Sequence, residues 1–133
     1  MRTEDFDITI DSFSYDNGVR VVSIEDGVSL VTAPIDAKTA NLWGKPHGGF
    51  LFTLADVSCG SLLTYTTQEA CVTVSTTIDF ISVPAENARE LRANGHIEKC
   101  GGKMAFCSCT ICDDTGKLIA RTTATWMLTG QKL

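Results

Sequence analysis

Two short stretches of the sequence combine residue types that could act on a carbonyl group. His47-Gly48-Gly49 stands where a loop passes into a long segment, and Asp56 follows eight positions after Gly48. The first backbone N–H groups of a helix have no partner within the helix, and the helix dipole favours negative charge there. Glycine lets a ligand approach the backbone closely. A helix start here could therefore stabilise an oxyanion, although a plain tight turn would use the same glycines.

Asp56 is the only acidic residue between Asp36 and Glu69, and its nearest neighbours in the chain are small or apolar. A carboxylate in such a setting is costly unless it meets water, a partner or a substrate. We therefore interpret Asp56 as functional rather than as part of a polar surface stripe. Eight helical residues span about 12 Å, at ~1.5 Å per residue. If Gly48 and Asp56 act on one substrate, they come from different chains, as two antiparallel helices across a two-fold axis would provide.

The segment that carries Asp56 is the only long one without strand alternation, and it predicts one helix from about Gly48 to Tyr65. Its many small residues predict close packing on both sides, as in a helix wrapped by a sheet. Strand patterns precede and follow it, and the short links between them favour an antiparallel sheet of five or six strands. The expected strands are residues 19–24, 28–33, 71–81, 89–100, 103–112 and 117–128. This order indicates an α+β fold.

The N-terminal residues 1–16 are ambiguous. Phe6, Ile8 and Ile10 alternate as in a strand, but the acidic residues and Ser12 and Ser14 weaken that interpretation. No repeat, low-complexity tract or linker interrupts the 133 residues, which suit a single domain over residues 1–133.

Composition excludes several classes of protein. The hydrophobic share of 44% is too high for a disordered chain, and a net charge of −5 argues against nucleic acid as the main partner. The sequence contains no run of Lys or Arg that could bind an anionic membrane, and no stretch approaches the ~20 apolar residues of a membrane span. The acidic N-terminus lacks the apolar core of a signal peptide. We expect a soluble, cytoplasmic protein.

The six cysteines suggest no metal site. Cys109 and Cys112 form one C-x-x-C pair, but no second pair or His pair stands at zinc spacing. Without a signal peptide, reduced thiols are expected. Cys107 and Cys109 alternate inside an expected strand, where they would share a face as small buried side chains.

The motif N-x-x-G-x-x-H-G-G-x-x-x-x-L-x-D, followed by small residues, resembles the PaaI-like (phenylacetate-degradation) branch of the hotdog-fold acyl-CoA thioesterases. The seven matching positions are Asn41, Gly44, His47, Gly48, Gly49, Leu54 and Asp56. The likeness covers roughly residues 17–129. It implies a hotdog fold, with an antiparallel sheet around one long central helix, and hydrolysis of acyl-CoA without metal or redox cofactor.

The resemblance also assigns roles to the residues of the motif. Asn41 and His47 would line the site, and the Gly48 N–H would polarise the thioester carbonyl, with Gly49 beside it. Asp56 of the facing subunit would act as nucleophile or general base, and the sequence does not distinguish these routes.

Two further roles, and the assembly, follow from the same resemblance. A hydroxyl on the strand after the helix would hold the water; the matching position is Thr73, with Ser75 as an alternative on the same strand face. The turn Gly101-Gly102-Lys103 would contact the CoA nucleotide, although an ordinary hairpin turn is an equal interpretation. The family tends toward homodimers paired into homotetramers.

Pro46 and Trp43 depart from the family pattern: Pro46 could stiffen the loop, and Trp43 could shape an acyl pocket or pack at a subunit interface. Other functions compete. Hotdog dehydratases use a His with an acidic partner on the helix, which His47 and Asp56 could imitate, but H-G-G at a helix start fits a thioesterase better. A non-catalytic acyl-CoA sensor usually carries a DNA-binding segment, for which this chain has no spare basic domain. The complete motif disfavours an inactive interaction module.

Overall fold

The computed structural model describes residues 7–133, and from β1 onward its elements follow the order expected from the sequence. Two strands precede the long helix and four follow it, each within four residues of its expected bounds. The elements are β1 (Arg20–Glu25), β2 (Val28–Pro34), α2 (Gly48–Thr67), β3 (Glu69–Phe80), β4 (Glu90–Cys100), β5 (Met104–Asp113) and β6 (Leu118–Lys132).

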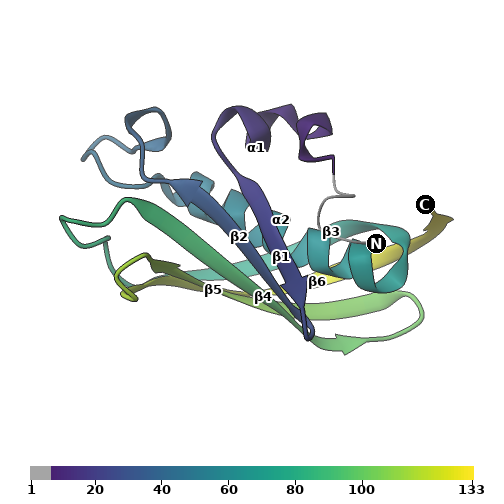
Figure 1. The fold of residues 1–133 in the computed structure, drawn as a ribbon. Coiled ribbons are helices and arrows are strands. Elements are labelled where there is room, and N and C mark those ends of the chain that lie inside the picture. The colour runs from purple at the N-terminus through teal and green to yellow at the C-terminus, as the bar shows by residue number, and fades with distance from the viewer. Residues whose placement is uncertain (1–6) are drawn as a thin grey trace.

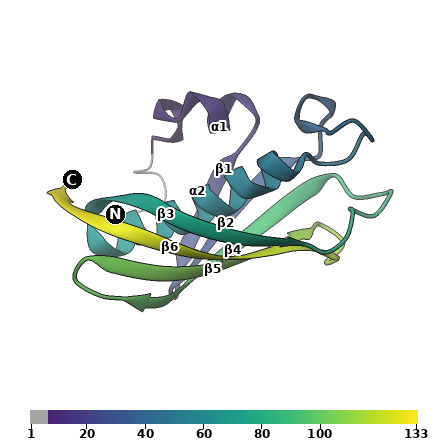
Figure 2. The ribbon, with the colours of Figure 1, turned by 180° about the vertical axis from the view of Figure 1, so that it is seen from behind.

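All six strands form one antiparallel sheet in the order β1-β2-β4-β5-β6-β3. The sheet curves along α2, and the short helix α1 (Ser12–Asp16) lies on the side of α2 away from β4, β5 and β6 (Figures 1 and 2). This arrangement confirms the expected hotdog fold. β3 is the last strand of the sheet, so its outer edge is unpaired within residues 7–133.

α2 packs against the sheet closely enough to require its small residues. A Cβ on Gly60 would lie 2.9 Å from the indole ring of Trp126, and a Cβ on Gly95 of β4 would lie 2.7 Å from Oγ of Ser58. The buried leucines Leu54 and Leu62 are fully enclosed, and each such side chain stabilises the fold by about 2 kcal/mol. The close packing expected from the helix composition is confirmed on the side that faces the sheet, whereas the face from Asp56 to Thr64 lines a cavity.

A bulge in β3 decides which of its side chains face α2. Thr73 pairs with Trp126 of β6, whereas Ser75 pairs with Thr125. Neighbouring residues of a strand point to opposite faces, and paired residues share a face. Because Trp126 is buried beneath α2, Thr73 faces the helix and Ser75 faces the outer side of the sheet. The expectation that Thr73 and Ser75 share a face is therefore wrong, and the extra residue, Val74, is the reason.

The N-terminal segment forms helical turns, although its sequence alternates between apolar and polar residues as in a strand. Ile8–Ile10 forms a 3-10 turn and α1 follows directly, so the segment that the sequence left ambiguous forms no strand at Ile8 and Ile10; Phe6 lies outside the described residues. Asp7 and Asp11 explain the difference, because their carboxylates accept hydrogen bonds from the backbone N–H groups of Thr9 and Ser14. Such local bonds compete with strand pairing.

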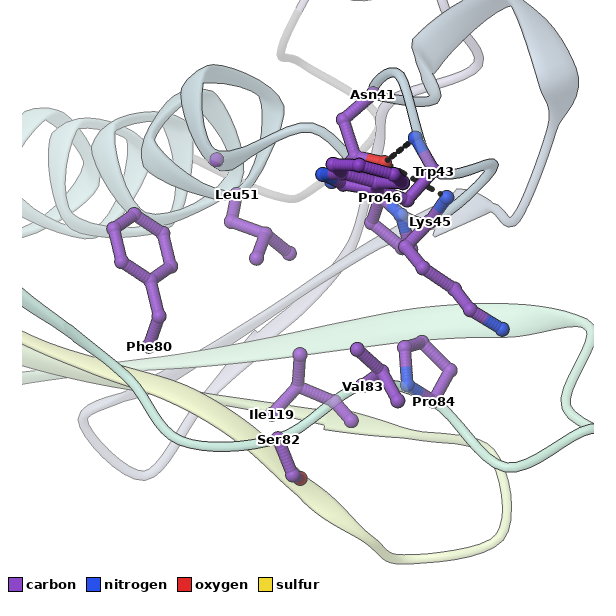
Figure 3. Close-up of a pocket in the computed structure, with 11 residues that line it drawn as sticks. Asn41, Trp43, Lys45, Pro46, Leu51, Phe80, Ser82, Val83, Pro84 and Ile119 are labelled. Atoms are coloured by element: carbon purple, nitrogen blue, oxygen red, sulfur yellow. Dashed lines mark hydrogen bonds between the residues drawn. The ribbon is translucent and has the colours of Figure 1, made fainter.

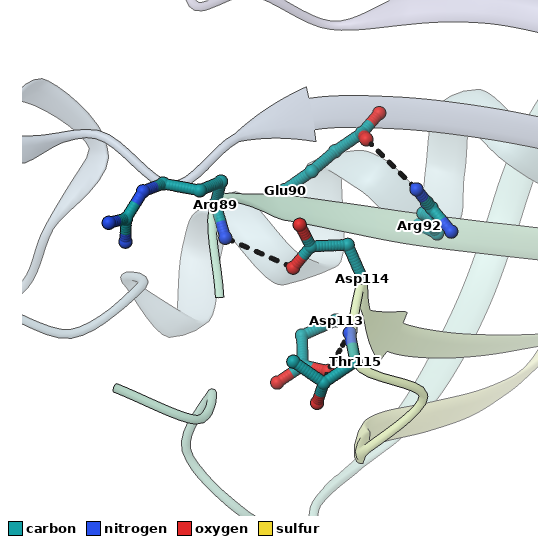
Figure 4. Close-up of polar contacts among 6 residues, drawn as sticks. All are labelled: Arg89, Glu90, Arg92, Asp113, Asp114 and Thr115. Carbon is teal, nitrogen blue, oxygen red and sulfur yellow. Dashed lines mark hydrogen bonds and ion pairs between the residues drawn. The ribbon is translucent and has the colours of Figure 1, made fainter. Parts of the chain in front are cut away.

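The turn between β5 and β6 is organised around the buried carboxylate of Asp113 (Figure 4). It accepts hydrogen bonds from the Thr115 hydroxyl at 2.6 Å and from the N–H groups of Ala85 and Lys117 at 2.9 and 3.0 Å. The hydrogen bond from Thr115 makes the largest contribution and the backbone hydrogen bonds act in the same direction, so the pKa of Asp113 is lowered to about 2. Because Ala85 lies between β3 and β4, Asp113 fixes the connection that begins at Ile81.

The cysteines are all free thiols in the described part of the chain. Cys107 and Cys109 are both buried, which confirms that they share a face of β5. Cys112 pairs with the exposed Arg92 and lies on the other face, so it does not converge with Cys109. Among residues 7–133, no group of three His, Cys, Asp or Glu side chains is arranged to hold a metal ion. Likewise, no described helix is long and apolar enough to cross a membrane.

Candidate active site

Asn41 folds the loop that leads into α2. Its side-chain oxygen accepts hydrogen bonds from the N–H groups of Trp43 at 2.9 Å and Lys45 at 3.0 Å (Figure 3). Gly44 adopts a positive φ of 74° within this turn, where a side chain would be strained. The loop closes when the His47 N–H donates to the Thr39 carbonyl at 2.9 Å. Asn41 thus positions the start of the helix.

His47 caps α2 with its own ring. Its Nδ1 accepts a hydrogen bond from the Gly49 N–H at 3.0 Å, so a neutral His47 carries its proton on Nε2. The Gly48 N–H has no hydrogen-bond partner within residues 7–133. The helix therefore begins with one free backbone donor at its positive end.

The Gly48 end of α2 opens into an apolar cavity of about 400 Å³. Figure 3 shows Trp43, Phe80 and Val83 among the side chains around it. A Cβ on Gly48 would lie 3.1 Å from the Phe80 ring, so glycine permits this close approach. An apolar cavity beside a free N–H can hold a carbonyl compound, with the oxygen at the N–H and the apolar part inside.

Asp56 lies half-buried on α2, where the Thr73 hydroxyl donates a hydrogen bond of 2.6 Å to its Oδ1. Burial, which disfavours the charged carboxylate, raises the pKa of Asp56 above its ordinary value. The Thr73 hydrogen bond opposes this rise, and the negative charge of Asp11 adds to it. The result is a carboxylate that is held in place and is more basic than an exposed one.

The chain does not bring Gly48 and Asp56 together. Asp56 opens into a separate cavity of about 390 Å³, whose lining includes neither His47 nor Gly48. The apolar cavity at Gly48 includes neither Asp56 nor Thr73. Both groups lie on the same straight element, about 12 Å apart at ~1.5 Å per residue. A single chain therefore presents the Gly48 N–H and the Asp56 carboxylate in two separate cavities.

The remaining candidate residues lie elsewhere. Ser75 is exposed on the outer face of the sheet, away from Asp56. Gly102 and Lys103 line a cavity of about 580 Å³ between the β4–β5 turn and the end of β6. The Gly101 N–H is already bonded to the Met104 carbonyl at 2.8 Å and the Lys103 carbonyl accepts the Leu128 N–H at 2.8 Å, which leaves the N–H groups of Gly102 and Lys103 without a backbone partner among residues 7–133.

Sequence reasoning missed one residue beside Asp56. Asp11 lines the same cavity as Asp56 and lies in the ambiguous N-terminal segment. The pattern Asp11-x-x-Ser14 is a helix-cap signal that could have predicted α1. Nothing in the sequence could have placed this cap against Asp56.

Comparison with known proteins gives a consistent family. Residues 44–120 match the model of the thioesterase superfamily. A curated Pseudomonas aeruginosa protein named "Putative esterase PA0474" is 37% identical over 81 residues, which cover 59% of this chain. The match spans 60% of the length of that relative.

Solved structures share the fold over nearly the whole chain. The E. coli PaaI protein from the phenylacetic acid degradation operon superposes with a TM-score of 0.82 over 92% of this chain and 87% of its own, at 24% identity, which shows the fold alone. The smu.793 protein of Streptococcus mutans, solved with acetyl-CoA, gives a TM-score of 0.78 at 27% identity, with coverages of 87% and 92%. A hypothetical thioesterase of Streptococcus pneumoniae, solved with coenzyme A, gives 0.77 at 25% identity, with the same coverages.

Removing the Thr73 hydroxyl should make Asp56 harder to ionise. In Thr73→Val the carboxylate loses the hydrogen bond that lowers its pKa, so the pKa should rise and Asp56 should ionise only at higher pH. Titration of the labelled Asp56 carboxyl carbon by NMR measures this directly. Thr73→Ser keeps the hydroxyl and should titrate like the wild type; a Thr73→Val titration that matches wild type would contradict the role of Thr73.

Proposed function

Since this chain belongs to the thioesterase superfamily, we propose that it hydrolyses acyl-CoA thioesters to a free acid and CoA. The observation that carries this proposal is the pairing, on one helix, of a free Gly48 N–H with a half-buried Asp56 held by Thr73. The first group suits the oxygen of a carbonyl under attack, and the second suits activation of the attacking group. The relatives solved with acetyl-CoA and coenzyme A support the choice of thioester.

In the proposed reaction, the thioester carbonyl oxygen accepts a hydrogen bond from the Gly48 N–H, and His47 holds the start of the helix through its bond from the Gly49 N–H. Asp56 then takes a proton from water while the water oxygen attacks the carbonyl carbon. The tetrahedral intermediate breaks its C–S bond, CoA leaves as a thiolate, and the thiolate takes up the proton that Asp56 removed from water, which restores the carboxylate. In the alternative route Asp56 attacks the carbon itself, the C–S bond breaks and CoA leaves as a thiolate; water then hydrolyses the resulting anhydride to the acid and the Asp56 carboxylate, and the proton released goes to the thiolate. Both routes use the same residues and need no metal or redox cofactor.

The site is proposed to form between two subunits. β3 is a 12-residue edge strand that carries exposed apolar side chains, including Val72, Val74 and Phe80. Such an edge is suited to pairing with another chain. Pairing with β3 of a second copy across a two-fold axis would set the two α2 helices antiparallel and bring Gly48 of one to Asp56 of the other. A homotetramer would join two such homodimers.

The CoA nucleotide is assigned to the turn at Gly102 and Lys103. The cavity of about 580 Å³ there is large enough for a nucleotide, and the exposed Lys103 supplies a cation to a chain whose net charge is −5. A lysine beside backbone N–H groups is a common phosphate contact. We assign the activity to the cytoplasm, where free thiols such as these six remain reduced.

Replacement of Asp56 should abolish thiol release. Asp56→Asn removes the base or nucleophile and should lower kcat/KM for acyl-CoA esters about 100- to 10,000-fold. The neutral amide no longer has to be desolvated as a charge, so the thermal midpoint at pH 7 should not fall. Asp26→Asn, in the β1–β2 turn, is the matched control and should be unaffected. Water loss without thiol release would indicate a dehydratase, and ester binding without turnover would indicate a non-catalytic acyl-CoA-binding protein.

Loss of the Lys103 charge should weaken binding of CoA esters without slowing the chemical step. In Lys103→Ala we expect KM to rise about three- to tenfold with kcat nearly unchanged, as for one exposed charge contact with phosphate. Lys117→Ala, in the next hairpin turn, should leave both constants unchanged. An unaltered KM in Lys103→Ala would contradict the assignment.

A further inference from the structure

The N-terminal segment lies across the cavity from Asp56. The cavity of about 390 Å³ has Asp7, Ile10 and Asp11 on one side and the face of α2 from Asp56 to Thr64 on the other. This segment lies outside residues 44–120, which match the family model. Its contact with the cavity is therefore a feature of this chain that the family match does not cover.

Among the described residues, the charge around this cavity is of one sign. The part of its lining that belongs to residues 7–133 contains the carboxylates of Asp7, Asp11 and Asp56, the thiol of Cys71 from β3, and no Lys, Arg or His. Within α2 the buried thiol of Cys59 also lies in the field of Asp56. Val21 and Trp126, from β1 and β6, carry no charge. Asp56 therefore meets like charges and a hydroxyl, but no cation within residues 7–133.

Asp11 is held in a fixed position. Its two carboxylate oxygens accept hydrogen bonds from the Ser14 N–H at 3.2 Å and the Ser14 hydroxyl at 2.6 Å. Ser14 is buried, and its carbonyl accepts the Val19 N–H at 3.0 Å where the chain enters β1. These bonds anchor the Asp11 carboxylate to the body of the domain.

The far end of α1 is anchored as well. The Arg20 guanidinium lies 3.9 Å from the centre of the Tyr15 ring and donates to the Tyr15 carbonyl at 3.1 Å. The Lys38 ammonium donates to the Asp16 carbonyl. A carboxylate on so restrained a helix cannot swing away from Asp56 to relieve their repulsion.

We propose that Asp11 is a positioning residue that acts through Asp56: its fixed negative charge, held across the cavity by α1, keeps Asp56 a stronger acceptor of the proton of the attacking water. The Asp11 charge raises the pKa of Asp56, in the same direction as burial and against the Thr73 hydrogen bond. A more basic carboxylate removes a proton more readily once ionised, but it is ionised only at higher pH. The catalytic part of this inference rests on the proposed function.

Asp11→Asn is the direct test, because asparagine caps a helix as well as aspartate and removes only the charge. The pKa of Asp56 should fall, so the acidic limb of the kcat/KM profile should move to lower pH. At a fixed pH on that limb the rate should rise about two- to fivefold, as expected for one lost charge interaction at moderate range. The difference from wild type should shrink in 1 M salt because salt screens such interactions.

Asp16→Asn is the matched control, since it removes the same charge from α1 at an exposed position that does not line the cavity. Asp16→Asn should leave the acidic limb of the kcat/KM profile at the same pH as in the wild type. Asp11→Ser, which also caps a helix, should reproduce the shift if Asp11→Asn folds poorly. The proposal would be overturned if the acidic limb of the kcat/KM profile lay at the same pH in the wild type, Asp11→Asn and Asp11→Ser. An equal shift of that limb in Asp16→Asn would also overturn it.

NMR titration of Asp56 separates this inference from the proposed function. A lower pKa for Asp56 in Asp11→Asn, measured without substrate, supports the coupling even if the wild type hydrolyses no ester. An unchanged Asp56 pKa in an enzyme that does hydrolyse acyl-CoA overturns the coupling and leaves the proposed function intact.

Discussion

Gly48, with its free N–H, and Asp56, with its carboxylate, lie eight positions apart on α2, and this spacing governs how a site can be assembled. At ~1.5 Å per residue the two groups are about 12 Å apart. The helix cannot bend them together because its buried side, from Leu51 to Leu63, is packed into the sheet. They also open into different cavities. A second α2, antiparallel to the first, would bring the start of one helix beside the middle of the other, and the unpaired edge of β3 is the element suited to arrange it.

The rest of the fold holds these two groups in place. His47 caps the helix and orients the Gly48 N–H, and Asn41 folds the loop that delivers His47. At Asp56, the bulge at Val74 in β3 turns Thr73 toward α2, where the Thr73 hydroxyl donates a hydrogen bond to the Asp56 carboxylate. Without that extra residue, Thr73 would follow the alternation set by Ser75 and face outward. The irregularity at Val74 thus places Thr73 where the proposed chemistry needs it.

Most of the fold could be predicted from the sequence because it rests on local signals. The helix at Gly48 and the strands follow from the change between helical and alternating patterns. The N-terminal alternation of Ile8 and Ile10 left that segment undecided, and in the structure capping by Asp7 and Asp11 outweighs it. The bulge at Val74 depends on pairing with β6, which no local pattern encodes. The contact of Asp11 with the cavity of Asp56 is equally long-range.

Mixing two inactive variants tests the shared site most directly. Gly48→Pro removes the N–H at the first helical position, where proline is tolerated, while Gly48→Ala adds a side chain and keeps the N–H as its control. In a refolded equal mixture of Gly48→Pro and Asp56→Asn, half of the dimers are mixed, and each mixed dimer has one complete site. We expect recovery of about a quarter of the wild-type activity, with mixed dimers verified by native mass spectrometry. Mixed dimers that form but stay as inactive as their parents would contradict a site built from Gly48 of one subunit and Asp56 of the other.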